Sequence, residues 1–404
     1  MDTTSLFNEA QARRPTREAS VASRATTVGL QCSENSVNTP AKAWRQIFTE
    51  SLIHNIVKYT NDYGSNKCKD WVNISKPDLM DFISCLFVAG IQKRKDAPAN
   101  WFSNSPVRES PIMKQITSGK KFHTILRYLH VCDLESQPAP SDENYTPIYK
   151  VQEMMEYLEE RYSKLYSPGE DLSLDESLIR CFGRIQFKVR IVTKAARYGM
   201  KLYVITDAMT AFVLKVIVYT GKYTYHQSDS VSEKKTVQVV KQLCKEYAGS
   251  HRTIYIDRFY TSIDLLKALD EMDLYVTGTM MKNRIPKDLV ITKSLKEFKQ
   301  MSRGDFKRHT YNYTMNDGRQ KTYGLVCWKD RDIVYCLTNR TNTNEEGCCY
   351  QRSAAGIVCI QRPKVIEYYN TYMGGVDIAD MRRLHCNSTI MGQNRWWLKL
   401  FFIY

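Results

Sequence analysis

Hydrophobic positions recur with helical spacing in the first part of the chain, between about residue 40 and residue 168. The first predicted helix, AWRQIFTESLIHNIVKYTNDYG, is indicated by apolar residues at three- and four-residue intervals: Trp44, Ile47, Phe48, Leu52, Ile56 and Tyr59. A second helix is predicted to begin at Ser75, with Pro77 and Asp78 in its first turn, and two more cover KKFHTILRYLHVCD and VQEMMEYLEERYSKLYS. We therefore expect residues 40–168 to form a helical domain.

After Gly169 the hydrophobic period changes from about 3.6 residues to 2, which indicates strands. A strand carrying Asp175 is followed by the segments MKLYVITD and AFVLKVIVYT, which predict a hairpin. A helix, the short strand TIYI ending before Asp257, and another helix come next. This order predicts an α/β fold with a ribonuclease-H-like core beginning over residues 169–273, whose neighbouring strands bring two carboxylates to one sheet edge.

Residues 274–368 are rich in turns and strand-like segments, which predicts a β-rich insertion. Helical spacing returns in YYNTYMGGVDIADMRRLH, so residues 369–404 are expected to form the second part of the core. Asp377 and Asp380 lie three residues apart there and project from one helix face. Residues 1–39, rich in Ser, Thr, Ala and Arg and without periodicity, are predicted to be a disordered tail.

Composition narrows the classes of partner and compartment. The formal net charge of +15 favours an anionic partner, with nucleic acid ahead of a membrane surface. The 12 cysteines include no C-x-x-C pair and several lie in apolar runs, which is typical of buried thiols in a reducing compartment. An N-terminal signal and an apolar run of transmembrane length are both lacking, so we expect a soluble intracellular protein with no membrane partner.

Cationic residues dominate the segment that follows Asp175. Between Ser177 and Thr206 there is no acidic residue, but there are seven basic ones: Arg180, Arg184, Lys188, Arg190, Lys194, Arg197 and Lys201. A strand carboxylate beside such a run suits an enzyme whose metal centre meets a polyanion, and a solvated basic hairpin is the structural alternative. Glu176 is expected to face solvent, because alternation on a strand turns it away from Asp175.

The acidic residues also have structural alternatives. Asp257 and Asp377 could each cap a helix, and Asp380 could interact with a helix dipole. The seven histidines show no metal-ligand spacing. Trp396 and Trp397 are expected to pack the last helix of the sequence rather than to stack on bases.

Seven motifs in order resemble the piggyBac-type transposases, from about Thr39 to the last residue. They are IVKYTNDYG with the later Trp71, LDESL with CFGR, KAARYGMK, DRFYTS, TGTMMKNRIP, YNTYMGGVDIADM and NRWWLKLF. The resemblance implies a DNA transposase that cleaves and joins strands in cut-and-paste transposition, excises its element through end hairpins and inserts at short AT-rich targets. It further implies double-stranded DNA as substrate, a homodimer, nuclear localisation, and a dimerisation or DNA-binding role for residues 40–168.

The same resemblance assigns the metal ligands. Asp175 takes the first position of the catalytic set, Asp257 the second and Asp377 the third, with Asp380 as a needed neighbour. All four are assigned as catalytic residues and metal ligands, with Asp377 or Asp380 completing one coordination sphere. Such a set implies Mg²⁺ or Mn²⁺, because hard divalent cations prefer carboxylate oxygens and a pair of them activates both the attacking and the leaving oxygen of a phosphodiester. Basic residues near the site are expected to hold the DNA backbone, namely Arg184, Lys194, Arg197, Lys201, Lys282 and Arg284.

Two features depart from the family pattern. Arg258 follows Asp257 where the family more often has Asn, and the sequence stops at NRWWLKLFFIY, before the Cys/His-rich module that family members commonly add. We expect a truncated copy, an incomplete gene model or a missing exon. Two functions follow as hypotheses: an active transposase, or a domesticated or degenerate derivative that binds DNA without transposing.

Overall fold

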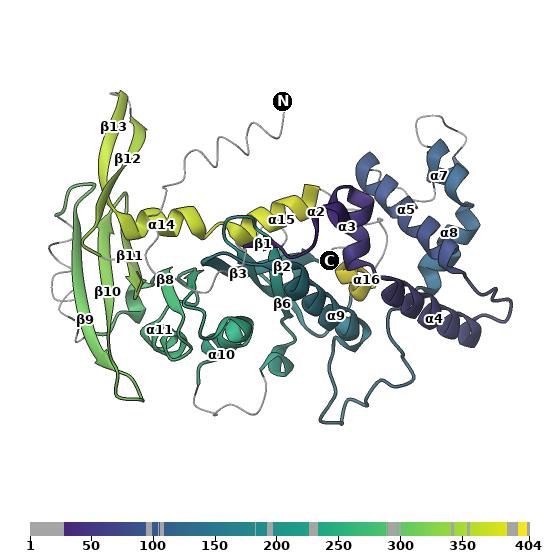
Figure 1. Cartoon of the computed structure of the whole chain (residues 1–404), viewed down its shortest axis with the longest axis horizontal. Helices are drawn as coiled ribbons and strands as arrows, with labels where there is room; N and C mark the ends of the chain where they lie inside the picture. Colours follow the sequence, from purple (N-terminus) through teal and green to yellow (C-terminus); the bar gives the residue numbers. More distant parts are fainter. Residues whose placement is uncertain are drawn as a thin grey trace. The chain divides into compact units, whose positions relative to one another are not determined.

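The computed structural model describes residues 28–93, 99–103, 105, 109–181, 183–191, 197–225, 233–287, 289, 297, 300–340, 343–353, 356–385 and 395–401 (Figure 1). These residues form two compact units. The first comprises residues 28–30, 167–173 and 247–374, and the second comprises residues 31–166, 174–246 and 375–401. In the part of the chain that the structure describes, no helix is both long and apolar enough to cross a membrane.

The second unit begins with helices that differ in one respect from the predicted pattern. The prediction of a single helix over AWRQIFTESLIHNIVKYTNDYG is wrong, because α3 (Pro40–Ile47) and α4 (Glu50–Lys67) are separate helices. Thr49 breaks the run: its side chain accepts a hydrogen bond from Leu52 N and caps α4. The prediction for α5 (Lys76–Gln92) is confirmed, and a capping box between Ser75 and Asp78 fixes its start.

Order also begins earlier than the composition predicts. Strand β1 (Gly29–Leu30) and helix α2 (Glu34–Val37) both lie within the segment predicted to be a disordered tail. The chain next to β1 is held by main-chain pairing, because Gln31 N donates to Leu165 O at 2.8 Å. Backbone pairing of this kind leaves no hydrophobic periodicity by which a sequence pattern could reveal it.

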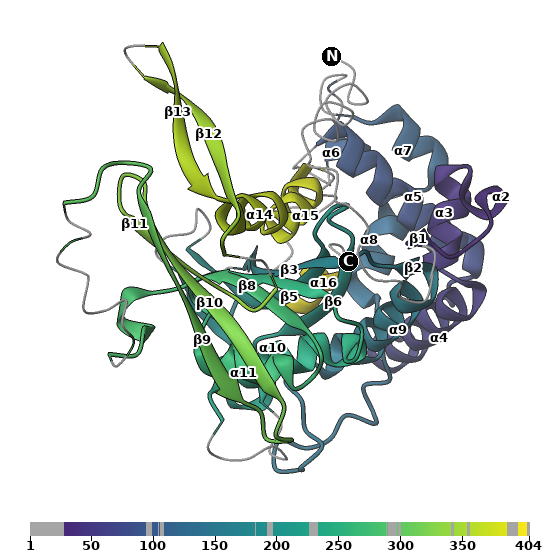
Figure 2. The ribbon, with the colours of Figure 1, turned by 60° about the vertical axis from the view of Figure 1, so that its left-hand side comes forward.

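Four further helices complete the helical part of the second unit: α6 (Ala99–Phe102), α7 (Pro111–Ile116), α8 (Gly119–Tyr128) and α9 (Tyr149–Leu165). Figure 2 shows α4, α5, α7 and α8 gathered together. Their core is aromatic: the Phe122 ring lies 4.9 Å from that of Phe82 and 4.6 Å from that of Trp101. This burial stabilises the helices far more than their intrinsic propensity does.

The strands of the second unit are antiparallel around β5 (Tyr198–Asp207). This strand pairs with β6 (Val213–Val218) in the predicted hairpin and with the short β4 (Lys188–Arg190), and it neighbours β3 (Asp171–Arg180). Helices α10 (Lys235–Cys244), α15 (Gly375–His385) and α9 pack against these strands, and α16 (Trp396–Phe401) packs against α9. The strands therefore form a sheet flanked by helices, as the change in hydrophobic period predicts.

The first unit continues from the start of β3 into β7 (Thr253–Ile256), α11 (Ile263–Asp270) and β8 (Tyr275–Thr279). β8 pairs with β7 in parallel, so the predicted insertion boundary at residue 274 falls too early. A parallel partner joined through a helix is a βαβ unit, and β8 therefore extends the core.

The insertion itself lies after β8. Strands β9 (Phe306–Thr314), β10 (Gln320–Lys329) and β11 (Ile333–Thr338) are antiparallel and join the sheet through β8. The separate hairpin β12 (Glu346–Ser353) and β13 (Gly356–Pro363) projects from one end of α14 (Lys364–Tyr372) (Figure 2). The helix predicted over YYNTYMGGVDIADMRRLH is two helices, α14 and α15, with Met373 and Gly374 between them.

Candidate active site

Asp175 lies half-buried in β3, and the residue two positions further on anchors α15. Ser177 points to the same face of the strand as Asp175, because side chains alternate along a strand. Its hydroxyl donates a 2.6 Å hydrogen bond to Oδ1 of Asp380. The same oxygen accepts hydrogen bonds from Nε and Nη2 of Arg383, at 3.3 and 3.0 Å. A network of Ser177, Asp380 and Arg383 thus ties the helix to the strand.

A second hydrogen bond, within the first unit, joins the start of β3 to the segment before α15. The Ser173 hydroxyl donates to the Met373 carbonyl at 2.6 Å. Within the second unit, Asp175 lies two residues before Ser177 on β3, and Asp377 lies three residues before Asp380 on α15. The hydrogen bond between Ser177 and Asp380 therefore ties the strand that carries Asp175 to the helix that carries Asp377.

Asp377 and Asp380 differ in their surroundings although they share one helix face. Asp377 is exposed in the first turn of α15, where a helix dipole favours negative charge. The carboxylate of Asp380 is half-buried and already bound to Ser177 and Arg383. At the other end of the helix, Arg382 Nη1 donates to the Thr210 carbonyl. The geometry therefore suits Asp377 to ligand binding and Asp380 to holding α15 in place.

Asp257 belongs to the first unit, where it begins the turn after β7. Its carbonyl accepts hydrogen bonds from Thr261 N at 3.1 Å and Thr261 Oγ1 at 2.9 Å. Its carboxylate Oδ1 accepts one from Arg258 N. The turn is thus rigidly formed around a half-buried carboxylate. Its proximity to the acids of the second unit stays a prediction.

Two of the resemblance motifs meet at this turn within the first unit. In the motif DRFYTS the Thr261 carbonyl accepts a 3.2 Å hydrogen bond from Nη1 of Arg284, which belongs to TGTMMKNRIP. A Cβ atom on Gly278 of that second motif would collide with Thr261 Oγ1 and would lie 2.7 Å from the Ile256 carbonyl oxygen. Only glycine permits this close approach of β8 to the turn that carries Asp257.

The predicted phosphate contacts fall into three groups. Arg184, Arg197 and Lys282 are exposed, as backbone-binding residues should be. Lys194 lies outside the described residues. Arg284 is held by the Thr261 carbonyl, and the Lys201 ammonium lies 3.8 Å from Glu176 Oε2 and 4.8 Å from the centre of the Tyr203 ring.

The pairing with Lys201 changes the interpretation of Glu176. This side chain is 18% exposed rather than solvent-facing, and the Lys201 side chain is 13% exposed. Alternation does turn Glu176 away from Asp175, but on the opposite face it meets β5 instead of water. The pair therefore joins two neighbouring strands.

The acids carry the donor atoms that a divalent cation requires. Asp175, Asp257 and Asp377 offer hard carboxylate oxygens, the donors that Mg²⁺ and Mn²⁺ prefer. Among the described residues, no three His, Cys, Asp or Glu side chains are grouped closely enough to hold a metal ion. The donor chemistry of the acids fits such a cation.

The fold defines the class of protein. A solved structure, described as a cryo-EM structure of a piggyBac transposase synaptic complex with hairpin DNA, superposes with a TM-score of 0.75 at 22% identity, covering 93% of this chain and 74% of that one. The ribonuclease-H-like α/β core predicted from the sequence is thereby confirmed.

The family follows from the sequence comparisons. The family model described as Transposase IS4 matches residues 39–404, and the chain belongs to that family, in its piggyBac type. Human PiggyBac transposable element-derived protein 3 is 26% identical over 378 residues, covering 89% of this chain and 58% of the relative. Human PiggyBac transposable element-derived protein 2 is 23% identical over 363 residues, with the same coverage. The chain thus spans 58% of the length of these relatives.

Sequence reasoning missed the residues that position the acids. Ser177 could have been found from its spacing of two from Asp175, and Arg383 from its spacing of three from Asp380. Thr261 carries no such signal, because its role depends on the main-chain path of the turn after β7. The packing role predicted for the two tryptophans holds within the second unit, where Trp397 is buried and the Trp396 ring meets Phe187 at 5.2 Å.

Proposed function

We propose that this protein is a DNA transposase that cleaves phosphodiesters and transfers strands in a metal-dependent reaction. The observation that carries the proposal is the hydrogen bond from Ser177 to Asp380, which ties the strand that carries Asp175 to the helix that carries Asp377. A fold that only bound DNA would not need a strand carboxylate and a helix carboxylate tied together. Family membership supplies the reaction class.

In this proposal each acid has a distinct task. Asp175, Asp257 and Asp377 would hold Mg²⁺ or Mn²⁺, and Asp380 keeps α15 in place through Ser177 and Arg383. When bound, such a cation pair would supply Lewis-acid activation of the attacking and leaving oxygens. The Ser177 hydroxyl and Arg383 both donate to Oδ1 of Asp380, so this carboxylate is held in one position.

The proposed substrate is DNA, and we propose that the protein acts on it as a homodimer in the nucleus. The structurally similar piggyBac transposase is described as bound to hairpin DNA in a synaptic complex. In this chain, the net charge of +15 and the exposed side chains of Arg184, Arg197 and Lys282 would neutralise backbone phosphates. These contacts position a duplex without reading its sequence.

A second candidate function is DNA binding without cleavage. It is favoured by one observation: the carboxylate of Asp380 is already engaged by Ser177 and Arg383. A derivative that had lost its chemistry would retain the same basic surface and the same fold.

Cleavage of DNA by purified protein separates the two functions. The whole chain is incubated with supercoiled plasmid and with a hairpin-ended oligonucleotide, in Mg²⁺, in Mn²⁺ and in EDTA. The proposal predicts metal-dependent nicking or hairpin opening that Asp175→Asn abolishes while binding of the same DNA in EDTA is retained. The matched control is Asp264→Asn, which alters an exposed acid of α11 and should leave cleavage unchanged. Binding without any nicking by the unaltered chain would support the second candidate and refute the first.

A further inference from the structure

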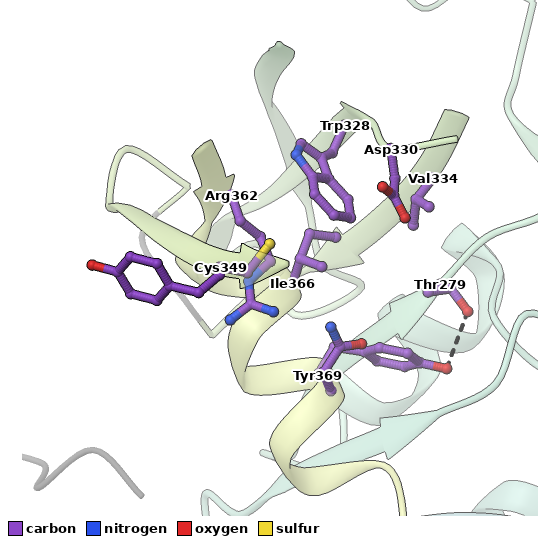
Figure 3. A pocket seen from close by; sticks show the side chains of 10 residues that line it. Thr279, Trp328, Asp330, Val334, Cys349, Arg362, Ile366 and Tyr369 are labelled. Atoms are coloured by element: carbon purple, nitrogen blue, oxygen red, sulfur yellow. Dashed lines mark hydrogen bonds between the residues drawn. The ribbon is translucent and has the colours of Figure 1, made fainter. Parts of the chain in front are cut away.

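A cavity of about 400 Å³ lies entirely within the first unit, and none of the four acids of the proposed active site lines it (Figure 3). It is formed by the end of β8, by β10 and β11, by the β12–β13 hairpin and by α14. Its volume falls within the range of about 300–1,000 Å³ that is typical of small-molecule sites. Its walls combine aromatic rings with side chains that can donate and accept hydrogen bonds.

Arg362, at the end of β13, supplies a donor that the protein itself does not use. Within the described part of the chain its buried Nε has no hydrogen-bond partner. The nearest carboxylate oxygen, Oε2 of Glu367, lies 3.8 Å from Nη2, beyond hydrogen-bond distance. A buried guanidinium N–H without an acceptor is unfavourable and needs an explanation. The Arg362 side chain lines the cavity and is 19% exposed, and the oxygens of a ligand phosphate match a guanidinium fork.

Two aromatic rings are held in place beside this donor. Trp328 Nε1 donates to the Gln361 carbonyl at 2.8 Å, and the Tyr369 hydroxyl accepts a hydrogen bond of 3.2 Å from Thr279 Oγ1. Figure 3 shows both rings on the cavity wall, with the guanidinium of Arg362 between Cys349 and Tyr369. Fixed aromatic faces of this kind stack on planar groups such as nucleobases.

Two further residues of the cavity offer acceptors, Asp330 and Asn370. Oδ1 of Asp330 accepts from Arg303 Nε at 2.8 Å, which offsets its charge, whereas Oδ2 accepts no hydrogen bond from the described residues. The exposed amide of Asn370 offers another carbonyl oxygen. Such acceptors match the exocyclic amino groups of adenine, cytosine and guanine, which thymine lacks.

We propose that this cavity binds one unpaired nucleotide of a DNA strand. Arg362 contacts its phosphate, Trp328 and Tyr369 flank the base, and Asp330 and Asn370 accept hydrogen bonds from the exocyclic amino group. A base pair inside a duplex could not enter a cavity of this size, so the nucleotide must be unstacked from its neighbours. The inference rests on the proposed function only in taking DNA as the substrate.

The test is equilibrium binding by fluorescence anisotropy in EDTA, so that no cleavage occurs. The probes are labelled dC10, labelled dT10 and a blunt duplex, with free dCMP as competitor. We expect dC10 to bind at least about fivefold more tightly than dT10, since an exocyclic amino contact contributes about 1–3 kcal/mol. Free dCMP should compete only at far higher concentration than dC10, because it lacks the neighbouring backbone contacts.

Substitutions locate the effect in the cavity. Arg362→Gln should weaken dC10 binding about tenfold and leave duplex binding unchanged, whereas Asp330→Asn should remove most of the preference for dC10 over dT10. The matched control is Arg308→Gln, which removes an exposed arginine of β9 paired with Glu346 at 3.4 Å. It should lower binding of dC10 and dT10 equally and by less than about threefold.

If circular dichroism shows that Arg362→Gln does not fold, Arg362→Lys is measured in its place. It should weaken dC10 binding at least about threefold, because a lysine lacks the fork geometry of a guanidinium. A folded Arg362 variant that binds dC10 within twofold of the unaltered chain would overturn the proposal. Equal affinities for dC10 and dT10, or competition by dCMP as strong as that of dC10, would overturn it too. Because these measurements need no cation, loss of cleavage with the dC10 preference intact refutes the proposed function alone.

Discussion

The two units of the molecule treat their polar side chains in opposite ways. In the second unit, Asp380 is bound by both Ser177 and Arg383, and Glu176 faces Lys201. In the first unit, the cavity keeps Arg362 Nε and one oxygen of Asp330 without partners among the described residues. Paired polar groups fix a geometry, and unpaired ones favour a ligand. In our proposals, the second unit therefore holds carboxylates in place, and the first unit accepts part of a substrate.

The largest expected effect concerns the turn that carries Asp257. Gly278→Ala should destabilise the protein by about 3 kcal/mol or more, because the new Cβ would collide with Thr261 Oγ1 and the Ile256 carbonyl. Gly374→Ala is the matched control, since a Cβ there meets nothing within 4 Å. Chemical unfolding measures both, and equal stabilities would contradict the close approach of β8 to the turn.

The second unit should lose stability in mild acid because of His130. Burial lowers the pKa of His130 to about 4, helped by the nearby charges of Lys150 and Arg395 and opposed by its hydrogen bond to the Tyr128 carbonyl. Between pH 6.5 and 4, His130 binds a proton in the unfolded chain but not in the folded chain. The free energy of unfolding therefore falls as the pH falls through this window. We expect a loss on the order of 2 kcal/mol, measured by denaturant unfolding at several pH values.

Two variants assign that loss to one histidine. His130→Gln should flatten the pH dependence across the window, although it lowers stability throughout by disturbing the stacking on Tyr63 at 3.7 Å. His54→Gln, at an exposed position of α4, should leave the dependence unchanged. An unaltered slope in the His130 variant would show that another group titrates.

Removal of the Ser177 hydroxyl should lower activity more than stability. Ser177→Ala deletes one of the contacts that hold Asp380, which contributes about 1–2 kcal/mol when the acceptor is charged. We expect cleavage to slow about tenfold with the melting temperature nearly unchanged. Ser163→Ala, which removes an exposed hydroxyl bonded to its own helix, is the control. Unchanged cleavage would mean that the hydrogen bond does not position α15 for the reaction.

The smallest effect concerns the exposed basic residues. Arg197→Gln should reduce the slope of log affinity for duplex DNA against log salt by about 1, as expected for one phosphate contact. Arg319→Gln is the comparison, because that arginine is exposed but bound to Asp317 and Asp273. Identical slopes for the Arg197 variant and the unaltered chain would remove Arg197 from the DNA interface.

Much of the fold was predictable, because helix starts, turns and hydrophobic periodicity are strong local signals in the sequence of each unit. The helix start at Ser75, the β5–β6 hairpin and the change of period after Gly169 are confirmed by the structure. The break at Thr49 was missed because the apolar face continues through it, and the parallel pairing of β8 was missed because a strand pattern does not reveal its partner.

For the candidate site, the sequence indicates the acids but not their surroundings. Motif order points to Asp175, Asp377 and Asp380, but the ion pair of Asp380 with Arg383 depends on how α15 meets β3. The cavity around Arg362 gave no sequence signal, since its lining comes from six separate elements from β8 to α14. Tertiary contacts of this kind join residues far apart in the sequence.

Cleavage by Asp175→Asn and Asp377→Asn, compared in one assay with Asp264→Asn, tests whether Asp175 and Asp377 are required for the proposed reaction. With Mn²⁺ and a hairpin-ended oligonucleotide, both of these variants should lose at least about a thousandfold in rate while binding that DNA in EDTA as the unaltered chain does. The Asp264 variant should cleave normally. Cleavage retained by either variant of the pair, at a rate near that of the unaltered chain, would contradict the account.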